Sequence, residues 1–254
     1  RGNAGSSCTE ESRLVNPSVR FKVCCIRDVA EAELALAHGA GAVGLVSRMP
    51  SGPGVIDDVM IAEVAAALRG RVETFLLTAE TTADRIHEQV ERLRPTTVQL
   101  VDSVAPDEIA RLRELSLRLE IVAVIHVTGE GSVAEAREAA RSADAILLDS
   151  GNPSAAVREL GGTGRVHDWT LSRQIVEAVD VPVWLAGGLD PENVTEAIAQ
   201  VRPAGVDICS GLRPDRETRA LDADRLARFS AAVQLAGVKL ASAHGDQNER
   251  SVPR

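Results

Sequence analysis

The chain of 254 residues has few aromatic side chains and no segment rich in lysine and arginine. It contains no tyrosine, two tryptophans and three phenylalanines, and its formal net charge is −9 at pH 7. Surfaces that bind nucleic acid usually combine clustered basic residues with aromatic rings on which bases stack. The composition therefore argues against a nucleic acid as a partner.

Cysteine is also scarce, and its spacing suits neither a zinc site nor a disulfide framework. The four cysteines are Cys8, Cys24, Cys25 and Cys209, and no C-x-x-C pair is present. Side chains of adjacent residues on a strand point to opposite faces, which separates Cys24 from Cys25. We therefore expect no metal site and a reduced environment.

Long apolar segments are absent. No run approaches the roughly 20 residues that span a bilayer, and the N-terminal region lacks the apolar core of a secretory signal. The sequence thus predicts a cytoplasmic protein without a membrane partner.

The ends of the chain differ from its middle. Residues 1–18 and 242–254 are rich in glycine, serine and charge and have no periodic apolar face. Such segments bury too little apolar surface to offset the entropy of ordering. We expect flexible tails flanking one domain at residues 19–241.

Within that domain, short β-branched runs alternate with longer amphipathic ones, which is typical of parallel strands joined by helices. The final helix is expected from about Asp222 to Leu240, and the helix before it is expected to be capped by Asp190 with Pro191 at its first position. Strands are expected at residues 21–26, 42–47, 72–78, 96–102, 119–126, 144–149, 181–186 and 206–210. Eight units in about 250 residues, with no G-x-G-x-x-G after the first strand, predict a closed (β/α)8 barrel.

The first strand carries a candidate base. Strand alternation places Lys22, Cys24 and Ile26 on one face, inside the barrel. The opposite, helix-facing side then receives three apolar or soft residues, namely Phe21, Val23 and Cys25. A thiol at the carboxyl rim can act as a base, or it can simply be a small buried residue.

The sixth strand ends in a candidate acid. Asp149 closes the apolar run of residues 145–148 at the rim where (β/α)8 enzymes place their active sites. Its carboxylate could act as a general acid or brace the loop that follows.

Two pairs of small residues follow the last two strands. Gly187 and Gly188 come after the seventh strand, and Ser210 and Gly211 after the eighth. Backbone N–H groups approach an anion closely where no Cβ intervenes, and the loops after strands seven and eight are the usual phosphate site of this fold. The pattern predicts a phosphate-binding site.

Three arginines also follow strands. Arg48, Arg165 and Arg213 come after the second, sixth and eighth, where each could meet a carboxylate or phosphate, although a solvated charge is the commoner role of such a residue.

Several short motifs together resemble one enzyme family. They are KVCC at Lys22, LLDS at Leu147, GGTGRVHDW at Gly161, LAGGLDPENV at Leu185 and GVDICSG at Gly205. Their order and content resemble the phosphoribosylanthranilate isomerase family of tryptophan biosynthesis, across nearly the whole predicted domain.

The resemblance implies a (β/α)8 barrel that performs an Amadori rearrangement of N-(5′-phosphoribosyl)anthranilate, without a metal or organic cofactor. It makes Cys24 the general base and Asp149 the general acid. The residues expected to bind the phosphate are Gly187, Gly188, Ser210 and Gly211. Those expected to contact the rest of the substrate are Asp207, Arg48, Gln99 and Gly162. The expected partner is a small phosphorylated sugar amine, and the sequence carries no prediction of oligomeric state.

The chain departs from the family pattern at several positions. Cys25 stands where a glycine is usual, Cys209 replaces a serine, His167 replaces an aromatic residue, and Val101 and Asp102 replace His-Gly. The loop at residues 49–56 has no arginine for the anthranilate carboxylate, which makes Arg48 the candidate substitute. Two alternatives stay open: an isomerase for another phosphorylated aminosugar, and a non-catalytic phosphosugar-binding barrel.

Overall fold

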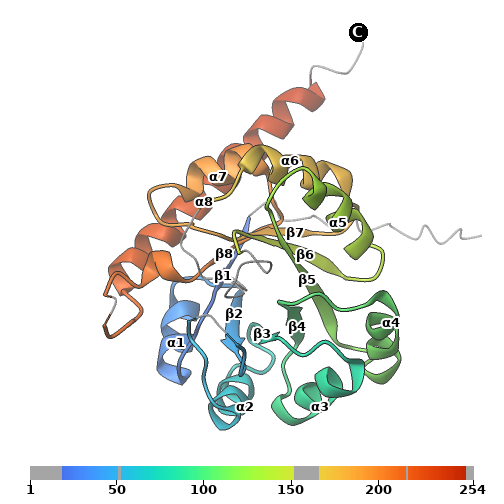
Figure 1. The fold of residues 1–254 in the computed structure, drawn as a ribbon. Helices are drawn as coiled ribbons and strands as arrows, with labels where there is room; N and C mark the ends of the chain where they lie inside the picture. The colour runs from blue at the N-terminus through green and yellow to red at the C-terminus, as the bar shows by residue number, and fades with distance from the viewer. Residues whose placement is uncertain (1–18, 51–52, 152–165, 216, 250–254) are drawn as a thin grey trace, which may run out of the picture.

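Eight parallel strands close into a barrel, and helices surround it (Figure 1). The computed structural model describes residues 19–50, 53–151, 166–215 and 217–249. Neighbouring strands pair in sequence order, and β1 closes the barrel by pairing with β8. The predicted (β/α)8 fold is confirmed.

Each predicted strand is present, within three residues of its expected bounds. The strands are β1 (Arg20–Val23), β2 (Ala42–Val46), β3 (Glu73–Thr78), β4 (Thr97–Leu100), β5 (Glu120–His126), β6 (Ala145–Asp149), β7 (Val183–Leu185) and β8 (Gly205–Ile208). The helices are α1 (Val29–Ala37), α2 (Asp58–Ala67), α3 (Ala83–Leu93), α4 (Pro106–Leu115), α5 (Gly131–Ala139), α6 (Trp169–Ala178), α7 (Val194–Val201) and α8 (Ala223–Glu249), with a short 3₁₀ turn, η1, at Ser210–Leu212.

The strands are buried on both faces, which explains their nearly continuous apolar sequences. One cluster lies between the barrel and its helices and includes Val43, Ile146 and Val206. A second cluster fills the barrel interior, where the rings of Phe75 and Trp184 meet edge to face with centroids 5.7 Å apart. Alternation along each strand therefore decides which side chains reach the interior.

The predicted start of the seventh helix is wrong. Residues 191–193 form a turn and α7 begins only at Val194. Asp190 accepts hydrogen bonds from the N–H groups of Glu192 and Asn193, and the Asn193 amide bonds in turn to Gly188 O at 2.9 Å. These local bonds fix a turn where Pro191 was expected to start the helix.

The last helix is longer than expected. Leu226, Phe229 and Val233 of this helix are buried against the barrel, but α8 runs past Leu240 to Glu249, into the segment expected to be a tail. Its last turns project beyond the other helices (Figure 1). Residues 1–18 and 250–254, the rest of the predicted tails, lie outside the described residues. Within the described part of the chain, no helix is both long and apolar enough to cross a membrane.

The barrel interior should tolerate no additional methyl group at Gly205. A Cβ built on this residue would lie 2.5 Å from Cε3 of Trp184, whose ring is 4% exposed and held against Phe75. We predict that Gly205→Ala lowers the free energy of unfolding by about 1–3 kcal/mol through overpacking. Urea titration followed by circular dichroism measures the change.

Gly129→Ala is the matched control, because a Cβ at Gly129 meets no atom within 4 Å. Its unfolding midpoint should stay close to that of the wild type. Equal midpoints for the two variants would show that the interior is not tightly packed at Gly205.

Candidate active site

The predicted chemical residues gather at one end of the barrel. Cys24 follows β1 directly, Asp149 is the last residue of β6, and the two small-residue pairs follow β7 and β8. Since all eight strands are parallel, their carboxyl ends meet at the same rim.

Cys24 belongs to the interior cluster and is 6% exposed, so the predicted inward orientation is confirmed. A Cβ on Gly44 of β2 would lie 2.8 Å from its sulfur, so only glycine fits beside the thiol. The predicted alternation of the first strand ends at Cys24. Cys25 joins the interior cluster and Ile26 the outer one, because β1 stops at Val23 and Cys25 adopts a φ of +61° that reverses the chain's facing.

Below Cys24, Lys22 is fully buried in the barrel interior. Its Nζ donates to Asp207 Oδ2 at 2.7 Å and to Gln99 Oε1 at 3.1 Å, and lies 5.2 Å from the centroid of Phe75. Burial alone would lower the pKa of Lys22, but the charge and hydrogen bond of Asp207, helped by the neighbouring cysteines, outweigh it and raise that pKa. Lys22 is thus a fixed cation close to both acidic groups.

Asp207 binds this cation and also lies close enough to Asp149 for their charges to interact. Burial raises the pKa of Asp207, Lys22 opposes that effect, and the nearby Asp149 carboxylate adds to it. Its Oδ1 is buried and has no hydrogen-bond partner among the described residues. One acceptor of Asp207 therefore remains available to a ligand, whereas Gln99 is occupied by Lys22.

Asp149 is half-buried, and one of its oxygens has a local structural role. Oδ1 accepts a hydrogen bond from the Ser150 N–H at 2.7 Å, while no described residue bonds to Oδ2. The loop-bracing interpretation fits Oδ1, and the second oxygen leaves room for acid chemistry.

The predicted phosphate loops contact one another. Gly187 and Gly188 have φ values of +81° and +65°, which glycine adopts without strain, and their N–H groups have no acceptor among the described residues. A Cβ on Gly211 would lie only 2.1 Å from Leu189 O. Ser210, exposed, begins η1 beside them. The glycines thus leave backbone donors open at the rim and let the two loops pack closely.

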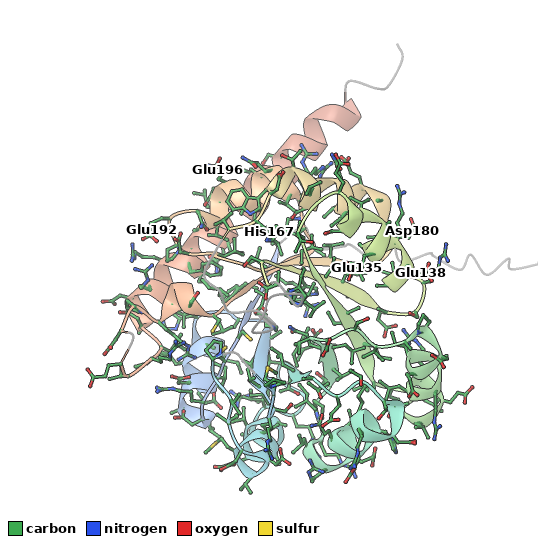
Figure 2. All side chains as sticks on the ribbon, in the orientation of Figure 1. Glu135, Glu138, His167, Asp180, Glu192 and Glu196 are labelled. Carbon is green, nitrogen blue, oxygen red and sulfur yellow. The ribbon has the colours of Figure 1, made fainter. Side chains whose placement is uncertain are left out.

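His167 lies beside these glycines, over the β6 and β7 side of the barrel (Figure 2). Its Nε2 pairs with Ser172 Oγ at 2.7 Å, and its buried Nδ1 has no partner in the described part of the chain. A Cβ on Gly187 would lie 3.0 Å from that Nδ1 and from Ser150 Oγ. Burial lowers the pKa of His167, against the attraction of Asp149 and Asp168, so a neutral ring is favoured next to the glycine pair.

Arg213 is not the solvated charge that an isolated arginine suggested. Both its terminal nitrogens bond to the Glu31 carboxylate at 2.9 Å, and Nη2 also donates to Cys25 O at 2.8 Å. The pair ties the β8 loop to α1 and to the residue after Cys24. Sequence patterns gave no signal for it, because the partners are 182 residues apart.

Two expected substrate contacts are less constrained. Arg48 is exposed, two residues after β2, and its guanidinium pairs with no described residue. Gly162, like Arg165, lies outside the described residues. No group of three or more His, Cys, Asp or Glu side chains in the described ranges is arranged to hold a metal ion.

The Glu31–Arg213 pair should make stability fall at acid pH. Burial alone would raise the pKa of Glu31, but the bonds and charge of Arg213, with help from Arg27, lower it. The carboxylate therefore stabilises the fold above its unfolded pKa of about 4.3, and this contribution is lost as pH falls through the lower folded value. We predict that Glu31→Gln reduces the free energy of unfolding by about 3 kcal/mol at pH 7, with the difference from wild type shrinking below about pH 4.

Urea titrations at several pH values test this. The control is Glu33→Gln in the same helix, which should change little because the ion pair of Glu33 with Arg71 is accessible to solvent. A deficit of Glu31→Gln that is independent of pH would contradict the assignment.

Comparison with known proteins agrees with this geometry. The family model "N-(5'phosphoribosyl)anthranilate (PRA) isomerase" matches residues 24–215. N-(5′-phosphoribosyl)anthranilate isomerase of Haloarcula marismortui is 34% identical over 211 residues, which is 83% of this chain and 94% of that protein. The enzyme of that name from Haloferax volcanii is 37% identical over 218 residues, covering 85% and 94%.

Solved structures share the fold. Phosphoribosyl anthranilate isomerase from Thermus thermophilus superposes with a TM-score of 0.70 at 24% identity, over 85% of this chain and 98% of that one. A phosphoribosyl anthranilate isomerase in complex with reduced 1-(o-carboxyphenylamino)-1-deoxyribulose 5-phosphate matches with a TM-score of 0.67 at 25% identity, over 85% and 98%. The chain therefore belongs to the N-(5′-phosphoribosyl)anthranilate isomerase family.

Proposed function

We propose that this protein isomerises N-(5′-phosphoribosyl)anthranilate to the corresponding 1-deoxyribulose 5-phosphate by an Amadori rearrangement, a step of tryptophan biosynthesis. The observation that carries the proposal is the placement of Cys24 and Asp149 at one rim, together with the glycine loops after β7 and β8, in a member of this family.

The reaction requires an acid and a base at different atoms of the sugar. Asp149 gives a proton to the ring oxygen, so that the C1′–O bond breaks and an iminium forms with the anthranilate nitrogen. Cys24, as the thiolate, then removes the C2′ proton, and the resulting enolamine tautomerises to the ketone. Lys22 supports this assignment, because it fixes a buried positive charge on the same inner strand face as Cys24.

The remaining contacts hold the substrate across the rim. We assign the phosphate to the N–H groups of Gly187, Gly188 and Gly211 with Ser210, since open backbone donors without Cβ atoms suit an anion. The free Oδ1 of Asp207 is placed to accept from a sugar hydroxyl. Gln99, held by Lys22, shapes the floor below the sugar. The substrate-binding role of Gly162, which lies outside the described residues, stays a prediction.

The related complex named above supports this ligand class, because its ligand carries both a 5-phosphate and a carboxyphenylamino group. We assign Arg48 to the carboxylate, since no described residue neutralises its guanidinium at the rim and the loop at residues 49–56 has no basic side chain. We also place the protein in the cytoplasm. Its described cysteines are free thiols, as a reducing compartment favours.

The decisive assay follows loss of substrate fluorescence with phosphoribosylanthranilate. Cys24→Ala and Asp149→Asn should each reduce kcat by about 10²- to 10⁴-fold, since each removes one proton-transfer group. Asp180→Asn makes the same chemical change before β7, at the other end of the barrel, and should leave turnover intact (Figure 2 labels Asp180).

Absence of turnover by the wild type at high enzyme concentration would contradict the proposal. Turnover of a different phosphoribosyl amine, lost in the same two variants, would indicate a paralogous isomerase. Binding of phosphorylated sugars without turnover of any amine would indicate a non-catalytic barrel.

Arg48→Ala should raise KM for phosphoribosylanthranilate about tenfold or more with a smaller change in kcat, because a charged hydrogen bond to a remote carboxylate contributes mainly to binding. The control is Arg69→Ala, an exposed arginine between α2 and β3 at the opposite end. Equal KM values for both variants would remove Arg48 from the substrate site.

A further inference from the structure

Two thiols lie in contact at the rim, next to Cys24. Cys25 follows β1 and Cys209 follows β8, and their sulfurs are 2.7 Å apart. Both are free thiols. A disulfide requires a sulfur separation of about 2.0 Å, so little movement separates this contact from a covalent bond.

The backbone at Cys25 is strained. Its φ of +61° lies in the left-handed region, which is strained for a residue with a Cβ and unstrained for glycine. Its side chain also restricts the loop after β2, because a Cβ on Gly54 would lie 2.5 Å from Cβ of Cys25. Strain of this kind points to a role for the side chain itself.

The two thiols have different proton affinities. Hydrogen bonding with Cys209 and with Cys24, together with burial, raises the pKa of Cys25 well above its ordinary value. Hydrogen bonding with Cys25 lowers the pKa of Cys209, and the positive charge of Arg213 adds to this against the effect of burial. Cys209, which is half-buried rather than buried, is therefore the nucleophile of the pair.

A cavity of about 290 Å³ gives access to both sulfurs from the side of the β8 loop. Cys25 and Cys209 form part of its wall, and Arg27, Arg213 and Arg219 line it together with Glu217. Arg27 and Arg213 are paired with Glu31, whereas the exposed Arg219 side chain has no charged partner among the described residues. Arg219 is thus the cation of this wall that is left to meet a carboxylate of a small reagent, beside the opposite charge of Glu217.

We propose that Cys25 and Cys209 form a reversible disulfide by exchange with an anionic low-molecular-weight disulfide such as oxidised glutathione. The Cys209 thiolate attacks one sulfur of the reagent, which forms a mixed disulfide and releases one thiolate. Cys25 then attacks the Cys209 sulfur, its proton passes to the second leaving thiolate, and the second reagent thiol departs. Two protein thiols are oxidised and one small disulfide is reduced to two thiols.

The bond has a consequence for Cys24. Cys25 follows Cys24 directly and lies with it in the interior cluster, so the movement that closes the bond acts beside the Cys24 thiol. This consequence, unlike the disulfide itself, rests on the proposed function, in which Cys24 is the base. We expect oxidation to reduce turnover by about tenfold or more, since small displacements of a reacting group have effects of this size.

The test treats the reduced, full-length protein with oxidised glutathione and measures intact mass and cross-linked peptides. Wild type and Cys24→Ala should both lose the mass of two hydrogens, without a glutathione adduct, through a bridge to Cys209 that dithiothreitol reverses. Cys25→Gly, which relieves the backbone strain, and Cys209→Ser should form no bridge. An unchanged mass, a stable glutathione adduct, or a bridge that requires Cys24 or Cys8 would overturn the proposal.

Turnover measured on the same samples is the second readout. Oxidation should lower the turnover of the wild type about tenfold or more, and dithiothreitol should restore it. Cys209→Ser cannot form the bridge, so oxidation should not lower its turnover in this way. A bridge that forms without loss of turnover would refute the regulatory consequence. Because the mass measurement needs no substrate, failure of the proposed isomerase activity would leave the disulfide test intact.

Discussion

Lys22 and Asp207 carry opposite charges inside the barrel, where the surrounding side chains are mostly apolar, and their contact of 2.7 Å determines how the rest of the rim can work. Removing one partner of such a pair leaves a buried charge and costs about 3–5 kcal/mol. The pair spans β1 and β8, which close the barrel, and their residues Lys22 and Asp207 face each other in the strand register. The same ion pair therefore supports barrel closure and fixes a cation next to Cys24.

The two proposed proton-transfer groups sit in different surroundings around that pair. Cys24 is buried in the barrel interior, above the cation of Lys22 on the same strand face. Asp149 is half-buried on β6, and its charge adds to the effect of burial in raising the pKa of Asp207, a second carboxyl group. The proposed base and acid thus lie at the same rim in different surroundings, with the glycines after β7 and in η1 providing uncharged donors for a phosphate.

Much of this arrangement could be predicted from the sequence, because it depends on periodicity. The alternation of β1 placed Phe21 and Val23 against the helices and Lys22 and Cys24 inside, as the structure shows. The same rule failed at Cys25, where a left-handed φ ends the alternation. The sequence could not predict that Glu31 pairs with Arg213, since a contact between residues 182 positions apart leaves no local pattern. The predicted start of α7 was wrong because the Asn193 side chain bonds to the backbone of Asp190 and Gly188 and holds a turn there.

The central claim is that one rim holds phosphate at the glycine loops and presents the sugar between Cys24 and Asp149. A crystal structure of this protein with reduced 1-(o-carboxyphenylamino)-1-deoxyribulose 5-phosphate tests it most directly. We expect the phosphate at the N–H groups of Gly187, Gly188 and Gly211, with the Cys24 sulfur and the Asp149 carboxylate on opposite sides of the sugar chain. A ligand phosphate bound away from these loops, or a sugar chain out of reach of either side chain, would contradict the account.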